Sequence, residues 1–143
     1  MTVNIFNQPP ESAVKKLLSA ANLDSSDLTP EHLRHFFGVG AEVKLEGVAG
    51  LELFDSVGLL RSLAVDSSRR GSGLGSKLVA HVENYARSHG VKSLYLLTVT
   101  AEDYFLHRGY RRISREDAPA AIMATKEFSE LCPMSSAFMA KQL

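Results

Sequence analysis

The feature that most constrains this chain is a glycine-rich loop in residues 63–76, between an expected strand and an expected helix. Its sequence is Leu-Ala-Val-Asp-Ser-Ser-Arg-Arg-Gly-Ser-Gly-Leu-Gly-Ser. The apolar run 59–65 is bounded by turn residues and predicts a strand. Apolar residues spaced by three and four predict the helix, namely Leu74, Leu78, Val82 and Tyr85. The stretch is therefore expected to form a strand–loop–helix unit.

Glycines and arginines make this loop a candidate anion site. Gly71, Gly73 and Gly75 permit positive φ angles and let a ligand approach the backbone closely. Successive N–H groups at the start of a helix can point at one anion, and the helix dipole favours negative charge there. Arg69 and Arg70 add formal positive charge beside those donors. The loop is expected to bind a phosphate.

Two common phosphate-binding motifs do not fit the spacing. A P-loop closes with Gly-Lys-Ser or Gly-Lys-Thr, whereas here Lys77 follows Ser76 and precedes Leu78. The dinucleotide fingerprint needs its third glycine three residues after the second, and Ser76 occupies that position. An ordinary connection with glycines for tight packing is the remaining alternative, and a second motif is needed to decide.

The loop resembles the acetyl-coenzyme A loop of the GNAT N-acetyltransferase superfamily, which reads Leu-x-Val, a short turn, then Arg/Gln-x-x-Gly-x-Gly/Ala. The matching residues are Leu63, Val65, Arg70, Gly73 and Gly75. Ser67 departs from the pattern, because the family usually has proline there. Segment 98–110 is similar to the family's next motif, Asn/Thr-x-x-Ala-x-x-Phe-Tyr-x-x-x-Gly-Phe. Its matching residues are Thr98, Ala101, Tyr104, Phe105, Gly109 and Tyr110. With two motifs in the right order, the chain is identified as a member of this superfamily.

The resemblance implies an α/β (α+β) fold in a single domain, residues 1–143. A mixed, mostly antiparallel, twisted sheet of six to seven strands is expected, with helices on both faces. Strands are expected at 2–6, 35–40, 45–54, 59–65, 93–98 and 137–141, and another from Tyr110. Helices are expected at 11–21, 74–90 and 120–131. A short helix is expected to begin at Pro30, with Thr29 as its N-cap, and another is expected to end at Gly109.

Composition excludes several classes of protein. The 143 residues, 45% hydrophobic and 22% charged, suit one globular domain. Lys plus Arg equals Asp plus Glu at 16 each, which argues against nucleic-acid and membrane partners. Cys132, the single cysteine, allows no intramolecular disulfide and is expected to be a buried apolar residue. Without a signal segment or a long apolar run, the chain is expected to be cytoplasmic. The histidines lack metal-ligand spacing, so no metal is expected.

The resemblance also implies how acetyl-coenzyme A is bound. The pantetheine arm pairs with the strand ending at Val65, and the pyrophosphate lies on residues 70–76. The implied cofactor-binding residues are Leu63, Ala64, Val65, Arg70, Gly71, Ser72, Gly73, Leu74, Gly75, Ser76, Thr98 and Phe105. Many family members protonate the leaving thiolate with a tyrosine at the position of Phe105. Here the hydroxyl lies one residue earlier, on Tyr104, about 100° around the helix. Tyr104 is thus a candidate general acid. The alternatives are that Tyr104 is a residue of the hydrophobic core and that a water molecule protonates the thiolate.

Two charged residues are candidates for the acceptor side of the reaction. Glu52, inside the apolar run 48–54, is the candidate base, unless it faces solvent. Arg61 suits a carboxylate on the acceptor, unless it is a surface charge or pairs with Glu102 or Asp103. The expected reaction is direct transfer of acetyl from acetyl-coenzyme A to a small amine in a ternary complex. An amino acid or amino-acid-like toxin is the favoured acceptor.

Most of the chain after Gly50 resembles a narrower group, the small acetyltransferases found with bacterial arsenic-resistance genes. The resemblance is carried by residues 59–65, 94–98 and 119–133. It implies a role in arsenic resistance or detoxification. Two other functions stay open: a catalytically idle coenzyme A-binding module, and an enzyme that acetylates protein N-termini or lysines. The expected partners are acetyl-coenzyme A and the amine, and a homodimer is an open alternative.

Overall fold

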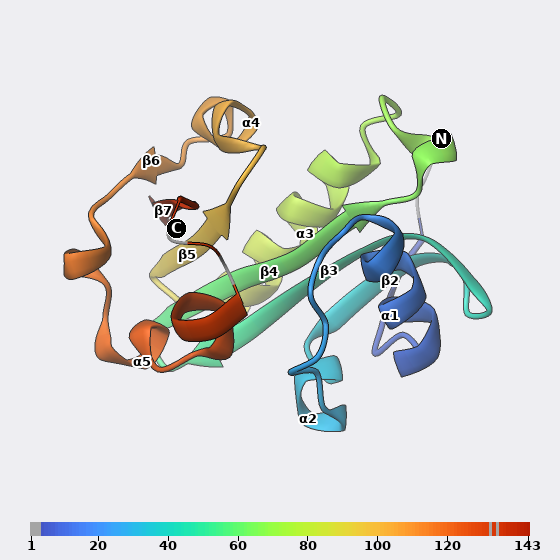
Figure 1. Ribbon diagram of the computed structural model, residues 1–143, viewed down its shortest axis with the longest axis horizontal. Coiled ribbons are helices and arrows are strands. Elements are labelled where there is room, and N and C mark those ends of the chain that lie inside the picture. Colours follow the sequence, from blue (N-terminus) through green and yellow to red (C-terminus); the bar gives the residue numbers. More distant parts are fainter. Residues whose placement is uncertain (1–3, 132, 134) are drawn as a thin grey trace.

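The computed structural model describes residues 4–131, 133 and 135–143. These residues form a seven-stranded sheet in the order β1-β2-β3-β4-β5-β7-β6 (Figure 1). The strands are β1 (Ile5–Asn7), β2 (Phe36–Ala41), β3 (Lys44–Phe54), β4 (Val57–Val65), β5 (Ser93–Thr98), β6 (Arg111–Arg112) and β7 (Ala137–Gln142). Only β4 and β5 pair in parallel. The mixed, mostly antiparallel sheet is confirmed; residues 2 and 3 of the expected first strand lie outside the described part.

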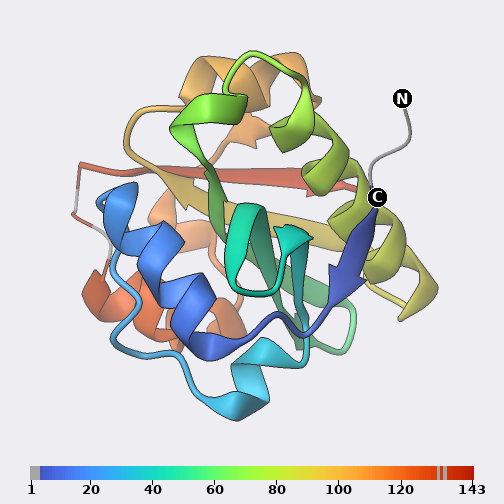
Figure 2. The same cartoon turned by 90° about the vertical axis from the view of Figure 1, so that its right-hand side faces the viewer.

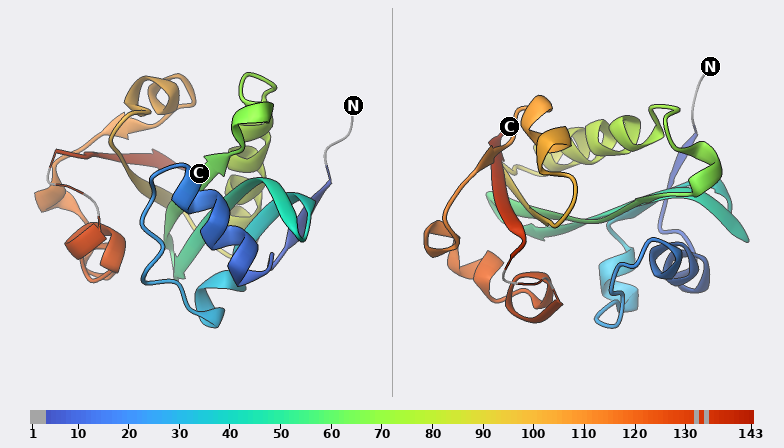
Figure 3. Two further views of the ribbon diagram at one scale, coloured as in Figure 1. Left: turned by 45° about the vertical axis from the view of Figure 1, so that its right-hand side comes forward. Right: turned by 45° about the horizontal axis from the view of Figure 1, so that its top comes forward.

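Helices cover both faces of the sheet, as expected. They are α1 (Glu11–Ala20), α2 (Pro30–Leu33), α3 (Leu74–Ser88), α4 (Glu102–His107) and α5 (Ala120–Met123). Short 3₁₀ turns, η1 (Ser67–Arg69) and η2 (Arg115–Asp117), and a π-helix, η3 (Glu127–Leu131), join them. Helices α3 and α4 lie on one face, and α1, α2 and α5 lie on the other (Figures 2 and 3).

The expected single helix over 120–131 is wrong, because α5 ends at Met123 and η3 begins at Glu127. Thr125 explains the break. Its hydroxyl donates to the carbonyl of Ile122 at 2.7 Å and accepts from the N–H of Phe128 at 3.2 Å. These local bonds compete with the α-helical pattern at this point. Glu127, at the start of η3, lies 3.2 Å from Arg61 of β4.

Each face of the sheet has its own hydrophobic core. On the α3 side the core includes Phe37, Leu60, Leu78, Val82 and Leu96, all buried. On the α1 side it includes Val14, Leu18, Phe36 and Val48. Gly50 lets the Phe36 ring pack against the backbone of β3, since a Cβ there would lie 2.4 Å from that ring. A third cluster, around Leu59, Ile122 and Phe138, lies beside α5. The three clusters hold the central strands between the helical layers.

Strands β4 and β5 pair only near their beginnings and then diverge. Their partners are Val57 with Ser93, Gly58 with Leu94 and Leu59 with Tyr95. Beyond that point β4 continues to Val65, while β5 pairs through its other edge with β7. The edge of β4 that faces β5 therefore presents backbone N–H and C=O groups without a neighbouring strand. An extended ligand can pair there as an added strand does.

A bulge in β4 accompanies this divergence. The register passes from Val48–Ala64 to Gly50–Arg61, so two residues of β4 lie opposite one residue of β3. Ser62 has a φ of 56°, a left-handed conformation that serine rarely adopts. The extra residue resets the alternation of side chains, so that Leu60 and Leu63 both pack on the α3 side. It leaves the Arg61 side chain buried beside the mouth of the opening.

Candidate active site

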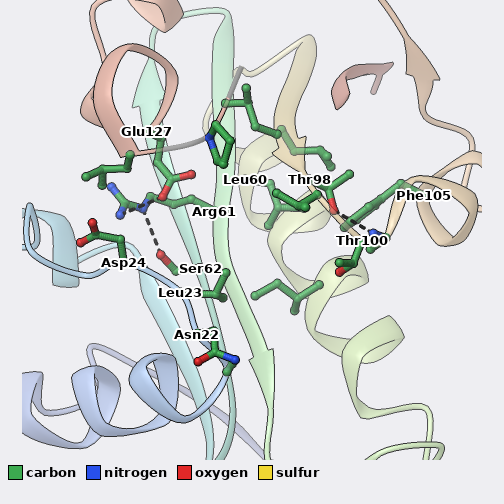
Figure 4. A pocket seen from close by; sticks show the side chains of 18 residues that line it. Asn22, Leu23, Asp24, Leu60, Arg61, Ser62, Thr98, Thr100, Phe105 and Glu127 are labelled. Atoms are coloured by element: carbon green, nitrogen blue, oxygen red, sulfur yellow. Dashed lines mark hydrogen bonds and ion pairs between the residues drawn. The ribbon is translucent and has the colours of Figure 1, made fainter. Parts of the chain in front are cut away.

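A cavity of about 570 Å³ occupies the opening between β4 and β5 (Figure 4). Its lining comes from segments that are far apart in the sequence. They are 21–24 after α1, 60–63 of β4, 96–101 from β5 to α4, Phe105 of α4, and Glu127, Leu131 and Pro133 near the C-terminus. Such a volume suits a small-molecule site. Leu63, Thr98 and Phe105, three of the expected cofactor-binding residues, lie in this lining.

The cavity has one charged wall and one neutral wall. Asp24, Arg61 and Glu127 gather on the side of β4 and are here called the charged wall (Figure 4). Thr98, Thr100 and Phe105 lie on the opposite side, which carries no charged residue (Figure 4). The segment with Asp24 is held by the end of α1, where Asn22 has a φ of 60° and the N–H of Leu23 donates to Leu18.

The glycine-rich loop has the geometry expected of an anion site. Gly71 and Gly73 have φ angles of 79° and 82°, and a Cβ at either would meet nothing within 4 Å. Gly73 is the N-cap of α3 and no side chain caps this helix end. The first N–H groups of α3 are therefore open to an external acceptor. The loop thus leaves room and donors for a diphosphate.

The two arginines of the loop differ. Arg69 donates to Glu46 Oε1 at 2.5 Å, so its charge is partly balanced within the chain. Arg70 is exposed and forms no ion pair with any described residue. Of the two, Arg70 is the one whose charge a ligand can use.

The side chains of the other residues expected to bind the cofactor pack within the chain or face solvent. The side chains of Ala64 and Leu74 are buried in the cores on opposite faces of the sheet. Val65 packs on the α3 side, 3.7 Å from where a Cβ of Gly75 would lie. Ser72 is exposed, and its hydroxyl donates to the carbonyl of Arg69 at 2.5 Å.

Tyr104 and Phe105 lie in different surroundings, although they are neighbours on α4. Phe105 is 5% exposed and lines the cavity. The Tyr104 hydroxyl lies 2.9 Å from the Ser76 hydroxyl, at the first turn of α3. It therefore joins the two expected cofactor motifs to each other. Its place is beside the glycine-rich loop rather than in the cavity lining.

Arg61 is paired by its own chain. Its side chain is fully buried, and its pairing with Glu102 or Asp103 is wrong. Its ion-pair partners are Asp27, Glu52 and Glu127 at 2.5, 3.0 and 3.2 Å. Burial alone would lower the pKa of Arg61, but these carboxylates outweigh it and raise the pKa above its usual value. The guanidinium therefore stays charged at the centre of a buried cluster.

Glu52 points into the molecule, so the solvent-facing alternative is wrong. Its carboxylate accepts from Arg61 at 3.0 Å and lies 3.7 Å from Nε2 of His32, with 13% of the side chain exposed. Burial raises the pKa of Asp27, but the hydrogen bonds from Arg61 and its positive charge together outweigh burial and hold that pKa below its usual range. Glu127 lines the cavity, whereas Glu52 lies behind its wall.

Sequence reasoning missed Asp27 and Glu127. Asp27 lies in the polar link before α2, and Glu127 looks like the solvent-facing side of an amphipathic helix. Neither belongs to a motif or follows a spacing that relates it to Arg61. A buried arginine in a strand could have signalled that carboxylates must reach it, but not which ones.

The same cluster brings three potential metal ligands together. Asp27, His32 and Glu52 each offer one ligand atom, all within 4.8 Å of one another. Both carboxylates, however, accept hydrogen bonds from Arg61. A guanidinium in that position repels a cation and occupies the oxygens that would bind it. We assign no metal to these residues.

Two expectations remain, one for Cys132 and one for membrane-spanning segments. Cys132 itself lies outside the described part. No helix among the described residues combines the length and the apolar character needed to cross a bilayer.

Comparison with known proteins agrees with this geometry. The amino-acid acetyltransferase of Ralstonia nicotianae is 38% identical over 65 residues, 46% of this chain and 14% of that protein. The crystal structure of N-acetylglutamate synthase from Neisseria gonorrhoeae, complexed with coenzyme A and N-acetyl-glutamate, matches with a TM-score of 0.81 at 21% identity. It covers 100% of this chain and 35% of that one.

Rv2747 of Mycobacterium tuberculosis, solved with CoA, matches with a TM-score of 0.79 at 19% identity over 98% of this chain and 99% of that one. At these identities the structural likeness concerns the fold. The chain spans only a small part of the curated relative it matches. The model of the acetyltransferase (GNAT) family matches residues 2–114, which include the glycine-rich loop, the diverging strands and Phe105. By this match and by its fold, the chain belongs to the acetyltransferase (GNAT) family.

Proposed function

We propose that this protein is an acetyl-coenzyme A-dependent N-acetyltransferase that acetylates the amine of a small molecule by direct transfer. One observation carries the proposal. The glycine-rich loop at the start of α3 continues, through the unpaired edge of β4, into the cavity between β4 and β5. An extended thioester carrier with a diphosphate at one end fits such a path. The amino-acid acetyltransferases among its relatives support the same reaction.

The chain's own groups suggest how the carrier would be held. The N–H groups of residues 71–76 and the dipole of α3 receive the diphosphate, with Arg70 beside them. The unpaired edge of β4 at Leu63 and Val65 pairs with the pantetheine amides. A backbone N–H there would also polarise the thioester carbonyl. Phe105 packs against the acyl end from the neutral wall.

The reaction moves an acetyl group and a proton. The amine nitrogen forms a bond with the carbonyl carbon, the carbon–sulfur bond breaks, and the thiolate receives a proton. Holding both reactants in one cavity supplies much of the rate through proximity. Glu52 is the proposed base and, since it lies behind the cavity wall, it would act through a water molecule. Tyr104 is the only proposed protein acid, and its position beside Ser76 favours water in that role.

The acceptor belongs to the small amines. The names of the curated relatives support an amino acid, and the resemblance to arsenic-associated acetyltransferases adds amino-acid-like toxins. A second candidate function is a catalytically idle coenzyme A-binding module. It is favoured by one observation: among the described residues, no tyrosine hydroxyl lines the cavity.

A thiol-release assay with acetyl-coenzyme A and a panel of amines tests the proposal. The panel would include amino acids, diamines, aminoglycosides and arsinic or phosphinic amino-acid analogues. Amine-dependent thiol release confirms the enzyme. Coenzyme A binding by calorimetry without release from any amine would support the idle module instead. Failure to bind coenzyme A would overturn both.

A further inference from the structure

We propose that the charged wall selects acceptors that carry a second cationic group, with Glu127 as the residue that sets this preference. Diamines and amino acids with a basic side chain have this chemistry. The inference rests on the proposed function and names the acceptor class for it. It departs from the expectation that Arg61 binds an acceptor carboxylate.

Every nitrogen of the Arg61 guanidinium already contacts a polar group of the protein itself. A guanidinium carries five N–H hydrogens. Nε donates to Ser62 Oγ at 3.0 Å. Nη1 donates to Asp27 at 2.5 Å and to Glu52 at 3.0 Å. Nη2 donates to Asp27 at 2.8 Å and lies 3.2 Å from Glu127. Four of these contacts are hydrogen bonds and the fifth is the ion pair with Glu127, so an anionic ligand would have to displace a carboxylate of the protein itself.

The charges of this region do not balance. Three carboxylates, from Asp27, Glu52 and Glu127, surround one guanidinium, which leaves a formal charge of about −2 on the cluster. Asp24 adds a carboxylate on the rim of the cavity. Protonation of His32, 3.7 Å from Glu52, would offset one of these charges only. The surplus is negative whichever state His32 adopts.

The cavity offers no other positive charge. Among its described lining residues Arg61 is the only cation. Lys126, next to Glu127 in sequence, is exposed and pairs with Glu130 at 2.7 Å. The neutral wall, with Thr98, Thr100 and Phe105, supplies hydroxyls and an aromatic ring but no charge (Figure 4). A bound acceptor therefore meets negative charge on one side and none on the other, which favours cations and rejects anions.

Three acceptors of equal length isolate the effect of charge. They are 1,5-diaminopentane, 5-aminopentanol and 5-aminopentanoate, in which a cationic, neutral or anionic group lies opposite the reacting amine. L-Ornithine, L-glutamine and L-glutamate repeat the series with amino acids. We expect kcat/KM from thiol release to fall in the order cation, neutral, anion. The first and last members should differ by at least about tenfold, as one charge-assisted contact would give.

Variants assign the preference to the charged wall. Glu127→Gln should reduce the ratio of cation to neutral kcat/KM about tenfold. Glu130→Gln, on the same π-helix but outside the cavity, is the matched control and should leave the ratio unchanged. Asp24→Asn tests the wall independently of the buried cluster, since an asparagine oxygen can still accept from the N–H of Ser26. It should reduce the ratio in the same direction.

The outcomes are distinguishable. The inference is supported if the protein prefers the cation, if Glu127→Gln or Asp24→Asn weakens that preference, and if Glu130→Gln leaves it unchanged. Equal or faster acetylation of 5-aminopentanoate or L-glutamate overturns it, while the proposed function stands. A preference that neither charged-wall variant alters also overturns it. If the protein acetylates none of the six amines, the inference is overturned as well. If the protein also fails to bind coenzyme A, the proposed function is overturned.

Discussion

At the scale of single residues, neighbouring positions on α4 contact different parts of the molecule. The ring of Phe105 lies in the cavity lining, and the hydroxyl of Tyr104 meets Ser76 at the first turn of α3. The two rings still contact each other, with centroids 5.0 Å apart. A hydroxyl moved by one position along α4 therefore lies outside the cavity lining and beside the glycine-rich loop.

Tyr104→Phe should raise the KM for acetyl-coenzyme A about fivefold and leave kcat unchanged. The substitution removes the hydrogen bond to Ser76 and keeps the ring packing. Steady-state kinetics measure both constants, with Tyr95→Phe on β5 as the control. A fall of about 100-fold in kcat with an unchanged KM would instead make Tyr104 the general acid.

Glu52→Gln should lower kcat about 100-fold at neutral pH, the usual effect of losing a general base. Coenzyme A affinity should not change, because Glu52 lies behind the charged wall and away from the glycine-rich loop. Glutamine can still accept from Arg61, which preserves the cluster. The exposed Glu31→Gln is the control. If the variant keeps a third of the activity or more, the base is another group, with Glu127 next to be tested.

At the scale of elements, α3 has two functions at two places along its length. Its N-terminus presents uncapped N–H groups at Gly73, and its body packs on the sheet through Leu78, Val79 and Val82. Gly90, just beyond the C-terminal end of α3, has a φ of 84°. The glycines at its two ends have the same left-handed conformation and different roles.

Gly73→Val should abolish coenzyme A binding and leave the protein folded. A Cβ at Gly73 meets nothing within 4 Å, so the fold loses only about 1–2 kcal/mol from the left-handed backbone, while the branched chain would fill the proposed path of the diphosphate. Isothermal titration and circular dichroism measure the two effects. Gly90→Val is the matched control, because its Cβ also meets nothing within 4 Å. Equal loss of binding in both variants would contradict the prediction.

His81 makes the packing of α3 on β2 sensitive to pH. Burial lowers the pKa of His81 below its usual 6.5, and its ring lies 4.8 Å from the Phe37 ring. The unfolded chain therefore binds the proton first, so this contribution to stability is complete above pH 6.5 and is lost as the pH falls further. Urea unfolding at pH 7.5, 6.5 and 5.5 should show the loss. His81→Gln should flatten the slope, and the exposed His107→Gln should not.

At the scale of the whole molecule, the Arg61 cluster connects three separate segments. Asp27 comes from the link between α1 and α2, Glu52 from β3 and Glu127 from η3 near the C-terminus. The cluster thus ties the α1–α2 link, β3 and η3 to β4. Its ion pairs contribute more to selecting this arrangement of the segments than to the overall free energy of unfolding.

Arg61→Met should destabilise the protein by about 3–5 kcal/mol, because three carboxylates lose the charge that compensates their burial. Urea unfolding at pH 7 measures the loss. Arg112→Met, whose ion pair with Glu102 is exposed, is the control and should cost less than about 1 kcal/mol. If Arg61→Met lost as little stability as the control, the carboxylates would be solvated and the cluster would not be structural.

The individual strands, α3 and the glycine-rich loop followed from the sequence, because each depends on residues that are close together in the chain. The mixed sheet was implied by the resemblance to the family. A glycine with positive φ, an apolar period and a helix cap act over a few positions, as Gly73, the run in α3 and Thr29 show. Glu52 was found because it interrupts such a run. The partners of Arg61 were not, since Asp27 and Glu127 follow no local pattern.

What the sequence by itself determined is the strand, loop and helix that would hold the diphosphate, encoded by glycines and by apolar spacing. What only the tertiary structure decided is the charge of the cavity. A buried guanidinium must be compensated by whichever carboxylates the folded chain brings to it, and that choice depends on how β3, η3 and the α1–α2 link pack around β4. Local sequence patterns carry no information on that packing, so the predicted anion-binding arginine became part of a negatively charged wall.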